Sequence, residues 1–329
     1  METTRIHILS GKDLKQVLTM ADCIDAMQDA FGALYRGEVE VPLRQGIDMK
    51  PDNGTALFMP VYSSDIHRVG VKAIMLNNDN PARGIPFIHA MLMLFDAATG
   101  KPIALLDGEV VTAMRTGAVS GLATRLLAAE DAKTAAIIGS GIQGETQLEA
   151  VCCARKIENA IVFDLDPERA ASFADRMSRR LGIDVAAASV PGMLAEADVI
   201  CTSTSSPKPV FDDAHIKGGA HINGVGSYQP HTAELPAETL LRAKIVVDRR
   251  QECLAEAGDL IQPINSGIFT AEHIHGDLGE VVAGKIAGRE SETEVTVFKS
   301  VGIAVQDLAA ADLALKLAKK AGVGQQIDL

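Results

Sequence analysis

One glycine-rich loop constrains the fold of this 329-residue chain more than any other segment. The apolar run 135–138 leads into GSGIQG at residues 139–144, and a helical pattern follows. In such a strand–loop–helix unit Gly139 permits a tight turn, Gly141 lets a ligand approach the backbone, and Gly144 lets the helix pack against the strand. The first N–H groups of that helix favour an anion. The loop therefore predicts a site for the pyrophosphate of a dinucleotide, and a glycine turn in an unrelated α/β domain is the alternative.

Asp164 completes this pattern because it ends the next predicted strand. A carboxylate at that place accepts hydrogen bonds from the ribose hydroxyls of NAD and repels the 2′-phosphate of NADP. Asp166 adds to the repulsion, although it is better placed to cap the helix that begins at Pro167. We expect NAD as the cofactor, with NADP as the alternative because Arg169 is nearby.

The order of the predicted elements divides the chain near residue 116. Before that point, the capping pairs Ser10/Asp13 and Thr19/Asp22 predict two helices, and short apolar runs separated by turn residues predict an antiparallel sheet. After it, strands and helices alternate, and the pattern at 304–321 predicts a last helix. The fold class is therefore α/β, a doubly wound parallel sheet beside a smaller α+β part. The predicted strands are 58–62, 70–76, 87–95, 103–106, 134–138, 160–164, 184–187, 198–202, 221–225 and 244–248, and the predicted helices among the later ones are 118–129, 144–155 and 167–181.

Composition and charge exclude several classes of protein. Hydrophobic residues make up 47% and charged residues 22%, which is typical of a folded globular chain. The 31 basic and 43 acidic residues give a net charge of −12, so no nucleic-acid partner is expected. Neither a signal peptide nor an apolar run of about 20 residues is present, which predicts a cytoplasmic protein without membrane contact. The five cysteines suggest no disulfide framework, and His273 and His275 lack a third ligand, so no metal is expected.

Three basic residues stand in or beside apolar stretches of the first part. Lys72 lies inside the apolar run 69–74, and a buried lysine is costly without an anionic partner. Burial also lowers the pKa of a lysine, which suits proton transfer. Arg44 and Arg115 are suited to bidentate binding of a carboxylate or a phosphate. Structural salt bridges or exposed side chains are the alternative for all three residues.

The chain resembles the ornithine cyclodeaminase/mu-crystallin family, which also contains archaeal-type alanine dehydrogenases and ketimine reductases. The resemblance covers nearly the whole sequence. The residues that carry it are Gly70-Val71-Lys72, Leu106-Asp107-Gly108, Thr112, Arg115-Thr116-Gly117-Ala118, the glycine loop ending at Gly144, His221-Ile222-Asn223, Val225-Gly226, Glu234-Leu235, Val246-Val247-Asp248 and the segment from Phe298 to Asp307.

The resemblance implies a homodimer built from two-domain subunits. A substrate-binding and dimerisation domain would span residues 1–116 and be joined by the C-terminal helix 305–329, and a Rossmann-type dinucleotide-binding domain would span 117–304. Arg44, Lys72 and Arg115 would hold the substrate carboxylate, with Lys72 as the catalytic proton-transfer residue. From the glycine loop and the resemblance together, the predicted cofactor-binding residues are Thr116, Gly139, Gly141, Ile142, Gln143, Gly144, Asp164, Thr202, Ser203, Val225 and Ser300.

Two departures from the family pattern bear on the reaction. Ornithine cyclodeaminases carry an acidic residue where this chain has Tyr228. A phenol ordinarily ionises at about pH 10, so it replaces a carboxylate base poorly. Family members also often place a small polar residue after Gly-x-Pro, where this chain has Phe87, with His89 nearby. Both changes favour a reductase.

We therefore expect NAD(P)H-dependent reduction of a small 2-imino acid to an L-amino acid. The enzyme would be a ketimine reductase of the Δ1-pyrroline-2-carboxylate type or an alanine-dehydrogenase-like amino-acid dehydrogenase. One alternative is ornithine cyclodeaminase, which forms L-proline and ammonia from L-ornithine with catalytic NAD. Another is a crystallin-like protein that binds NAD and a ligand without turnover.

Overall fold

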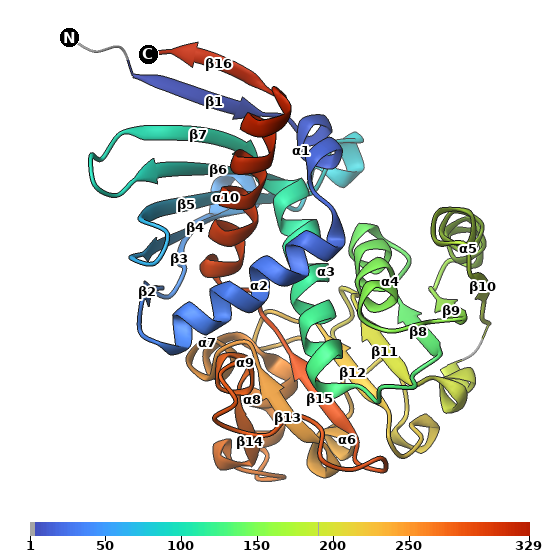
Figure 1. Cartoon of the computed structure of the whole chain (residues 1–329). Helices are drawn as coiled ribbons and strands as arrows, with labels where there is room; N and C mark the ends of the chain where they lie inside the picture. Colours follow the sequence, from blue (N-terminus) through green and yellow to red (C-terminus); the bar gives the residue numbers. More distant parts are fainter. Residues whose placement is uncertain (1–3, 190) are drawn as a thin grey trace. The chain divides into compact units, whose positions relative to one another are not determined.

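A computed structural model describes residues 4–189 and 191–329 of the chain. The chain divides into two compact units (Figure 1). The first unit contains the residues up to Arg115 together with Ile303–Leu329, and the second contains Thr116–Gly302. The last segment of the chain is therefore part of the same unit as the first.

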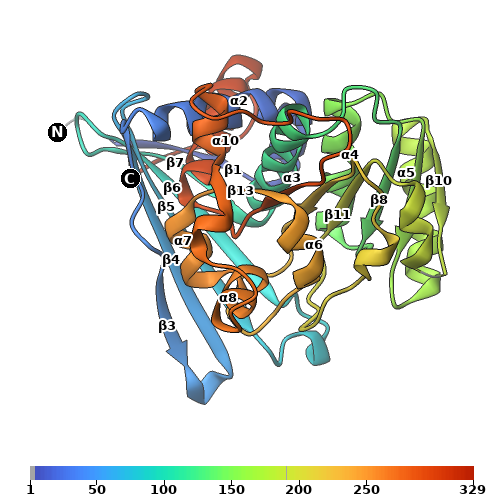
Figure 2. The ribbon, with the colours of Figure 1, turned by 90° about the horizontal axis from the view of Figure 1, so that it is seen from below.

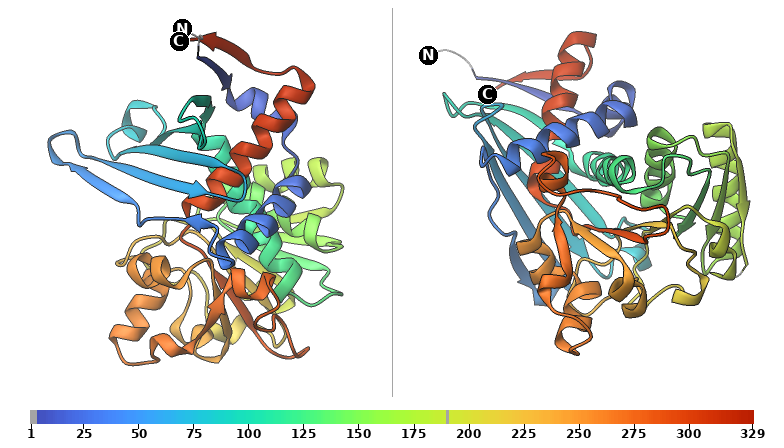
Figure 3. Two further views of the ribbon diagram at one scale, coloured as in Figure 1. Left: turned by 60° about the vertical axis from the view of Figure 1, so that its left-hand side comes forward. Right: turned by 60° about the horizontal axis from the view of Figure 1, so that its bottom comes forward.

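The first unit is built on a mainly antiparallel sheet in the order β16-β1-β7-β6-β5-β4-β2, with β3 also paired to β4. Among the described residues of this sheet, β1 and β7 are the one pair of neighbouring strands that runs in parallel. Its strands are β1 (Arg5–Leu9), β2 (Val39–Glu40), β3 (Gln45–Met49), β4 (Gly54–Ser63), β5 (Arg68–Asn77), β6 (Ile88–Asp96), β7 (Pro102–Asp107) and β16 (Gln325–Asp328). The four strands predicted before residue 107 correspond to β4 through β7, whereas β1 and β16, which lie side by side in Figure 3, were not predicted. The prediction of a C-terminal helix over 305–329 is wrong at its end, because the helix stops at Ala321 with Gly322 in the left-handed region and β16 follows.

Three helices accompany this sheet: α1 (Gly11–Val17), α2 (Met20–Tyr35) and α10 (Ala304–Ala321). Both predicted caps are confirmed, because Ser10 and Asp13 form a capping box and the Thr19 side chain accepts a hydrogen bond from Asp22 N. Helix α10 packs against β4, β5, β6 and α2, and Figure 3 shows it lying across the sheet. The packing is apolar: Leu92 and Leu94 of β6 are buried. One face of the sheet is thereby covered.

The second unit contains a fully parallel sheet in the order β10-β9-β8-β11-β12-β15-β13-β14. The chain runs from β8 outward through β9 to β10 and then returns to β11 on the other side of β8, so the doubly wound Rossmann-type prediction is confirmed. Figures 1 and 2 show α5 beside β10 at one end of this sheet. The strands are β8 (Thr134–Ile138), β9 (Asn159–Phe163), β10 (Asp184–Ala187), β11 (Val199–Thr202), β12 (His221–Gly224), β13 (Lys244–Val247), β14 (Ile274–Asp277) and β15 (Thr296–Lys299).

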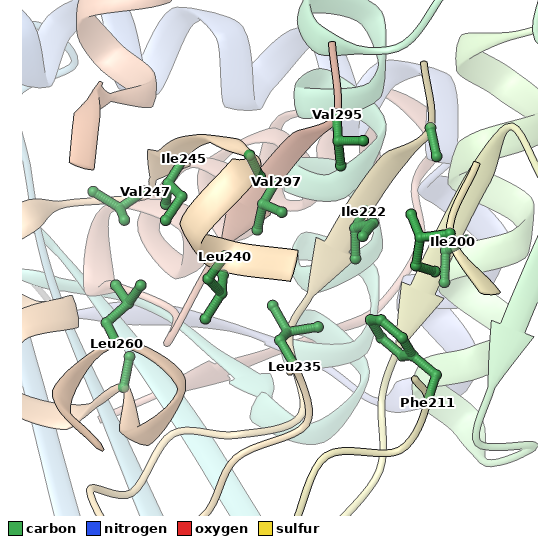
Figure 4. Close-up of a cluster of buried hydrophobic side chains, with 14 of the residues drawn as sticks. Ile200, Phe211, Ile222, Leu235, Leu240, Ile245, Val247, Leu260, Val295 and Val297 are labelled. Carbon is green, nitrogen blue, oxygen red and sulfur yellow. The ribbon is translucent and has the colours of Figure 1, made fainter. Parts of the chain in front are cut away.

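Its core lies on the faces of these strands. Ile200, Ile222 and Val297 come from neighbouring strands and are fully buried. Figure 4 shows them facing Leu235 and Phe211, which lie in the connecting segments.

The remaining helices are α3 (Gly108–Leu127), α4 (Ile142–Ala154), α5 (Pro167–Leu181), α6 (Ala237–Arg242), α7 (Arg250–Glu256), α8 (Gly258–Asn265) and α9 (Leu278–Val282), and the 3-10 turns are η1 (Lys50–Asp52), η2 (Pro81–Arg83), η3 (Pro191–Glu196), η4 (Asp213–His215) and η5 (Ala271–His273).

The start of α3 corrects the sequence analysis. The predicted helix began at residue 118, whereas α3 begins at Gly108, directly after β7. Asp107 Oδ1 accepts hydrogen bonds from Glu109 N (2.9 Å) and Val110 N (3.0 Å), and these bonds satisfy the first helical donors. The early part of α3 was missed because its Gly and Thr residues have low helix propensity and its buried faces leave no amphipathic pattern. Strands β14 and β15 and the short helices α6–α9 were also not predicted.

Candidate active site

The glycine loop forms the turn between β8 and α4. Gly139 has φ +103°, and a Cβ at Gly144 would overlap the carbonyl oxygen of Gly139, so both positions need glycine. Gly141 is the N-cap of α4 and provides no side-chain cap. A Cβ at Gly141 would meet nothing within 4 Å. The start of α4 therefore has no side-chain cap and has space beside Gly141, which fits an anionic group such as a pyrophosphate.

Asp164 lies directly after β9 and is bound to this loop. Its Oδ2 accepts hydrogen bonds from Ser140 N (2.8 Å) and Ser140 Oγ (2.5 Å), and its Oδ1 accepts one from Asp166 N (3.1 Å). Burial opposes ionisation of Asp164, but these hydrogen bonds outweigh it and lower the pKa of the carboxyl. Asp166 caps α5, as predicted, by accepting hydrogen bonds from Glu168 N and Arg169 N. Asp164 is thus an anion that also fixes the loop.

Most of the other predicted cofactor residues lie at one edge of the parallel sheet. Thr202 ends β11 and Ser203 follows it, while Val225 follows β12 and Ser300 follows β15. Strands β8, β11, β12 and β15 are consecutive neighbours, so their carboxyl ends meet at the same edge as the glycine loop. Thr116 lies in α3 instead, where its carbonyl oxygen accepts a hydrogen bond from Gln147 Nε2 (3.1 Å) of α4.

Buried charged residues behind this edge were not recognised as functional from the sequence. Asp248 accepts hydrogen bonds from Ser300 Oγ (2.6 Å), Val301 N (3.1 Å) and Gly302 N (2.8 Å), and so fixes the loop after β15. Glu234 accepts hydrogen bonds from Thr204 N in the loop after β11 and from Gly226 N in the loop after β12, and so fixes both loops. Both residues are among the matches that carry the family resemblance, and a carboxylate beside an apolar run was the available signal.

A second cluster, in the first unit, gathers around Lys72 of β5. The Lys72 side chain is 1% exposed, and its Nζ donates hydrogen bonds to Asp307 Oδ1 (2.7 Å) and Thr112 Oγ1 (3.2 Å). Arg115 Nε donates to the same oxygen of Asp307 (3.0 Å), and Arg115 Nη1 donates to Gln306 Oε1 (2.8 Å). One carboxylate oxygen is therefore shared by two cations.

Local structure explains how these side chains meet. Lys72 is paired in register with Met59 and Leu92 and points with Leu92 to the sheet face that α10 covers. Asp307 lies in the first turn of α10 and is also buried. A Cβ at Gly70 would come within 3.0 Å of Leu308, so α10 lies close to β5 here. The sheet and the returning helix together enclose the lysine.

Burial and the neighbouring charges together lower the pKa of Lys72. Burial lowers its pKa, Asp307 raises it, and Arg115 and Arg44 lower it further, with a resulting pKa of about 7. The half-buried Arg44 precedes β3. Burial raises the pKa of Asp307, but Lys72 and Arg115 outweigh burial and lower it. A lysine and an arginine that share one carboxylate, with Arg44 acting on the lysine as a further cation, form a cluster suited to bind an additional anion and to transfer a proton.

The other residues singled out in the sequence lie outside these two clusters. Tyr228 is partly buried against the core of the second unit, and His89 Nδ1 lies 3.3 Å from Glu109 Oε1. His273 and His275 each contact a backbone carbonyl oxygen through Nε2. Residues 4–189 and 191–329 contain no group of three His, Cys, Asp or Glu side chains arranged to hold a metal. In the same ranges, no helix has both the length and the hydropathy needed to cross a membrane.

Known proteins resemble this chain over nearly its whole length. The ornithine cyclodeaminase/mu-crystallin family matches residues 5–320. The Δ1-pyrroline-2-carboxylate reductase of Bacillus cereus is 36% identical over 323 residues, which cover 98% of this chain and 99% of that protein. The solved structure of the Δ1-pyrroline-2-carboxylate reductase of Thermococcus litoralis, in complex with NADH and L-proline, is 41% identical with a TM-score of 0.95, covering 98% of this chain and 100% of that one. An archaeal alanine dehydrogenase dimer with bound NAD is 31% identical with a TM-score of 0.92, covering 98% and 99%.

Proposed function

Because this chain belongs to the ornithine cyclodeaminase/mu-crystallin family, we propose that it reduces Δ1-pyrroline-2-carboxylate, a small cyclic 2-imino acid, to L-proline with NADH. The observation that carries the proposal is the buried cluster of Lys72, Asp307 and Arg115, in which a lysine with a pKa of about 7 adjoins an arginine. The reductases at 36% and 41% identity support this substrate over the open-chain imine of pyruvate and ammonia.

Each basic residue has a role in this reaction. Arg115 and Arg44 bind and orient the substrate carboxylate. Lys72 gives a proton to the imine nitrogen, which makes C2 electrophilic, and it regains a proton from solvent after turnover. Bound NADH supplies the hydride that C2 accepts. Asp307 keeps Lys72 and Arg115 in place and partly offsets the loss of hydration around the ammonium.

The second unit fits NAD as the cofactor. The open, uncapped start of α4 suits the pyrophosphate, with Gly139, Gly141, Ile142, Gln143 and Gly144 forming its cradle. Asp164 follows β9 and has a lowered pKa, and a carboxylate after the second strand of such a fold accepts hydrogen bonds from a ribose hydroxyl, which supports NAD over NADP. The remaining residues that we assign to the cofactor site are Thr116, Thr202, Ser203, Val225 and Ser300.

We further infer a cytoplasmic homodimer whose subunits meet at the uncovered face of the first unit's sheet. Side chains alternate along β6, so Leu92 and Leu94 are buried under α10 while Met91 and Met93 are 53% and 41% exposed. Met75 of β5 adjoins them on the same face. Such an apolar surface is typical of a protein interface, and the archaeal alanine dehydrogenase is a dimer with bound NAD. The free thiols of the five cysteines agree with a reducing compartment.

The dimer is tested by light scattering after gel filtration. We expect twice the mass of one chain for the wild type and one chain for the double variant Met91→Lys/Met93→Lys. A wild-type monomer would contradict the proposed interface.

The activity is tested by following NADH consumption with purified protein. Δ1-Pyrroline-2-carboxylate should be consumed with NADH and yield L-proline, whereas Δ1-piperideine-2-carboxylate and pyruvate with ammonia should react more slowly. L-Ornithine with NAD⁺ is assayed in parallel for proline and ammonia. Proline and ammonia from ornithine, without net change in NADH, would instead establish a cyclodeaminase that functions with Tyr228 in place of an acid. Binding of NADH and imine without consumption would identify a ligand-binding protein.

A further inference from the structure

The loops after β11 and β12 converge on the carboxylate of Glu234, which is fully buried. Its Oε1 accepts hydrogen bonds from Thr204 N (2.6 Å) and Thr204 Oγ1 (2.8 Å) in the first loop. Its Oε2 accepts hydrogen bonds from Thr202 Oγ1 (3.0 Å), Gly226 N (2.7 Å) and Ser227 N (3.2 Å). One side chain therefore connects two loops that follow neighbouring strands.

The two loops are also in direct contact. Val225 N donates a hydrogen bond to Thr202 O (3.0 Å). A Cβ at Gly226 would overlap Thr204 O and would lie 2.5 Å from both carboxylate oxygens of Glu234. Only glycine fits at this junction, so the position of one loop determines the position of the other.

Glu234 belongs to a buried cluster with Lys299 and Asp259. Lys299 Nζ lies 2.7 Å from Asp259 Oδ2 and donates a hydrogen bond to Ser227 O (2.7 Å). Asp259 Oδ1 accepts hydrogen bonds from Glu234 N (2.6 Å) and Leu235 N (2.9 Å). Burial raises the pKa of Glu234, whereas Lys299 and the hydrogen bonds from Thr204 oppose that rise. Every hydrogen-bond partner of the carboxylate is a donor, which suits its ionised form. Two carboxylates and one ammonium leave this cluster with one excess negative charge.

The place of these loops in the sheet connects them with the cofactor. The strand order reverses between β8 and β11, and a dinucleotide binds across such a reversal at the carboxyl ends of the strands. The glycine loop after β8 takes the pyrophosphate, and Asp164 after β9 is on the adenosine side. The nicotinamide half then extends over the loops after β11 and β12, which Glu234 connects.

We propose that Glu234 is the positioning residue for the nicotinamide half of the cofactor, holding both loops in place and favouring the oxidised ring through its buried negative charge. This proposal rests on the proposed use of NAD. The nicotinamide ring is positively charged when oxidised and neutral when reduced, so a nearby negative charge distinguishes the two forms. Glu234 acts through the loops and through its electric field, without contact with the reacting atoms.

The proposal is tested by measuring the dissociation constants of NADH and NAD⁺ by calorimetry. For Glu234→Gln we expect the constant for NADH to rise by about tenfold, because hydrogen bonds to the loops are lost. The constant for NAD⁺ should rise by about threefold more than that for NADH, because the charge is removed too. Thr204→Val removes the hydrogen bond from Thr204 Oγ1 to Glu234, together with the one that Thr204 Oγ1 accepts from Ser206 N in the same loop. The charge does not change, so both constants should rise by the same factor, about threefold.

Asp198→Asn is the matched control. Asp198 Oδ2 accepts hydrogen bonds from Lys133 N (2.7 Å) and Thr134 N (2.8 Å), and Lys217 Nζ lies 2.5 Å from its Oδ1. This carboxylate therefore also connects backbone segments and pairs with a lysine, but at the amino edge of the same sheet. Both dissociation constants should stay at the wild-type values in this variant.

Several outcomes overturn the proposal. Equal dissociation constants in Glu234→Gln and the wild type exclude a positioning role. An unchanged ratio of the two constants in Glu234→Gln excludes the charge effect. If that variant does not fold, wild-type binding by Thr204→Val excludes the connection between the loops. A wild-type protein that binds neither form of the cofactor removes the proposed function as well, so the two failures are distinguishable.

Discussion

Lys72 in the first unit and Lys299 in the second are both removed from solvent, and each ammonium lies 2.7 Å from an aspartate oxygen. Their pKa values nevertheless move in opposite directions. Burial lowers the pKa of both, but around Lys72 the carboxylate of Asp307 is opposed by Arg115 and Arg44, and the pKa falls to about 7. Around Lys299 the carboxylates of Asp259 and Glu234 act together, and the pKa rises.

The difference shows that burial alone does not make a lysine reactive. What decides is the sum of the charges that share its low-dielectric surroundings. An excess of cations leaves Lys72 able to release a proton near neutral pH. An excess of carboxylates keeps Lys299 charged, and it then serves as a fixed structural cation.

The largest expected effect comes from removing Lys72, the proposed proton donor. Lys72→Met should lower turnover of Δ1-pyrroline-2-carboxylate by about two to four orders of magnitude, because the proton donor is lost. The measurement is the steady-state rate of NADH oxidation. Lys72→Arg separates charge from proton transfer, because arginine keeps the positive charge but does not release its proton near neutral pH. Turnover close to wild type in either variant would exclude Lys72 as the acid.

Removing the structural lysine should affect folding instead. Lys299→Met leaves Asp259 and Glu234 buried without a cation, and breaking a buried pair in this way costs about 3–5 kcal/mol of unfolding free energy. Urea unfolding measures this change. Lys316→Met is the control, because the Lys316 side chain is 64% exposed and its buried partner Asp312 also pairs with Arg68, so about 0.5 kcal/mol is expected. Equal stabilities of the two variants would contradict the structural role.

Asp307→Asn changes the charge balance around Lys72 without removing the lysine. Asp307 is the group that raises the pKa of Lys72, so its loss should lower that pKa further. At neutral pH a smaller fraction of Lys72 would be protonated, and turnover should fall by about 10- to 100-fold. A pH profile that keeps its wild-type midpoint in this variant would show that another group supplies the proton.

The pH profile of the wild type is the mildest test. The donor must be protonated, and Lys72 loses its proton as the pH rises through about 7. We expect kcat/KM to be constant below that value and to fall by about tenfold per pH unit above it. Lys299, whose pKa is raised, should contribute no step in this range. A kcat/KM that instead rises with pH would indicate a base in place of an acid.

Much of the second unit could be predicted from the sequence because its signals are local. The strand at 134–138, the glycine loop and the cap at Asp166 each depend on a few consecutive residues, and the structure confirms all three. The predicted start of α3 was wrong, and β14 and β15 were missed. The amphipathic pattern of a helix and the alternation of polar and apolar residues in a strand are weak where both faces of a segment are buried.

The candidate active site could be predicted only in part from such local sequence signals. The position of Lys72 in an apolar strand indicated a buried lysine that needs an anion. The anion, Asp307, is 235 residues away in the sequence. Nothing in the local pattern of the last helix distinguishes Asp307 from an exposed helical carboxylate.

By itself, the sequence determined the doubly wound dinucleotide fold, the place of the glycine loop and the residue types available for chemistry, since these follow from short-range patterns of polarity and conformation. Only the tertiary structure decided which charges meet: that α10 returns to place Asp307 against Lys72 and Arg115, and that Asp259 and Glu234 surround Lys299. Electrostatic interactions act through space, and folding brings together groups that are far apart along the chain. The same residue type therefore has a lowered pKa in one unit and a raised pKa in the other.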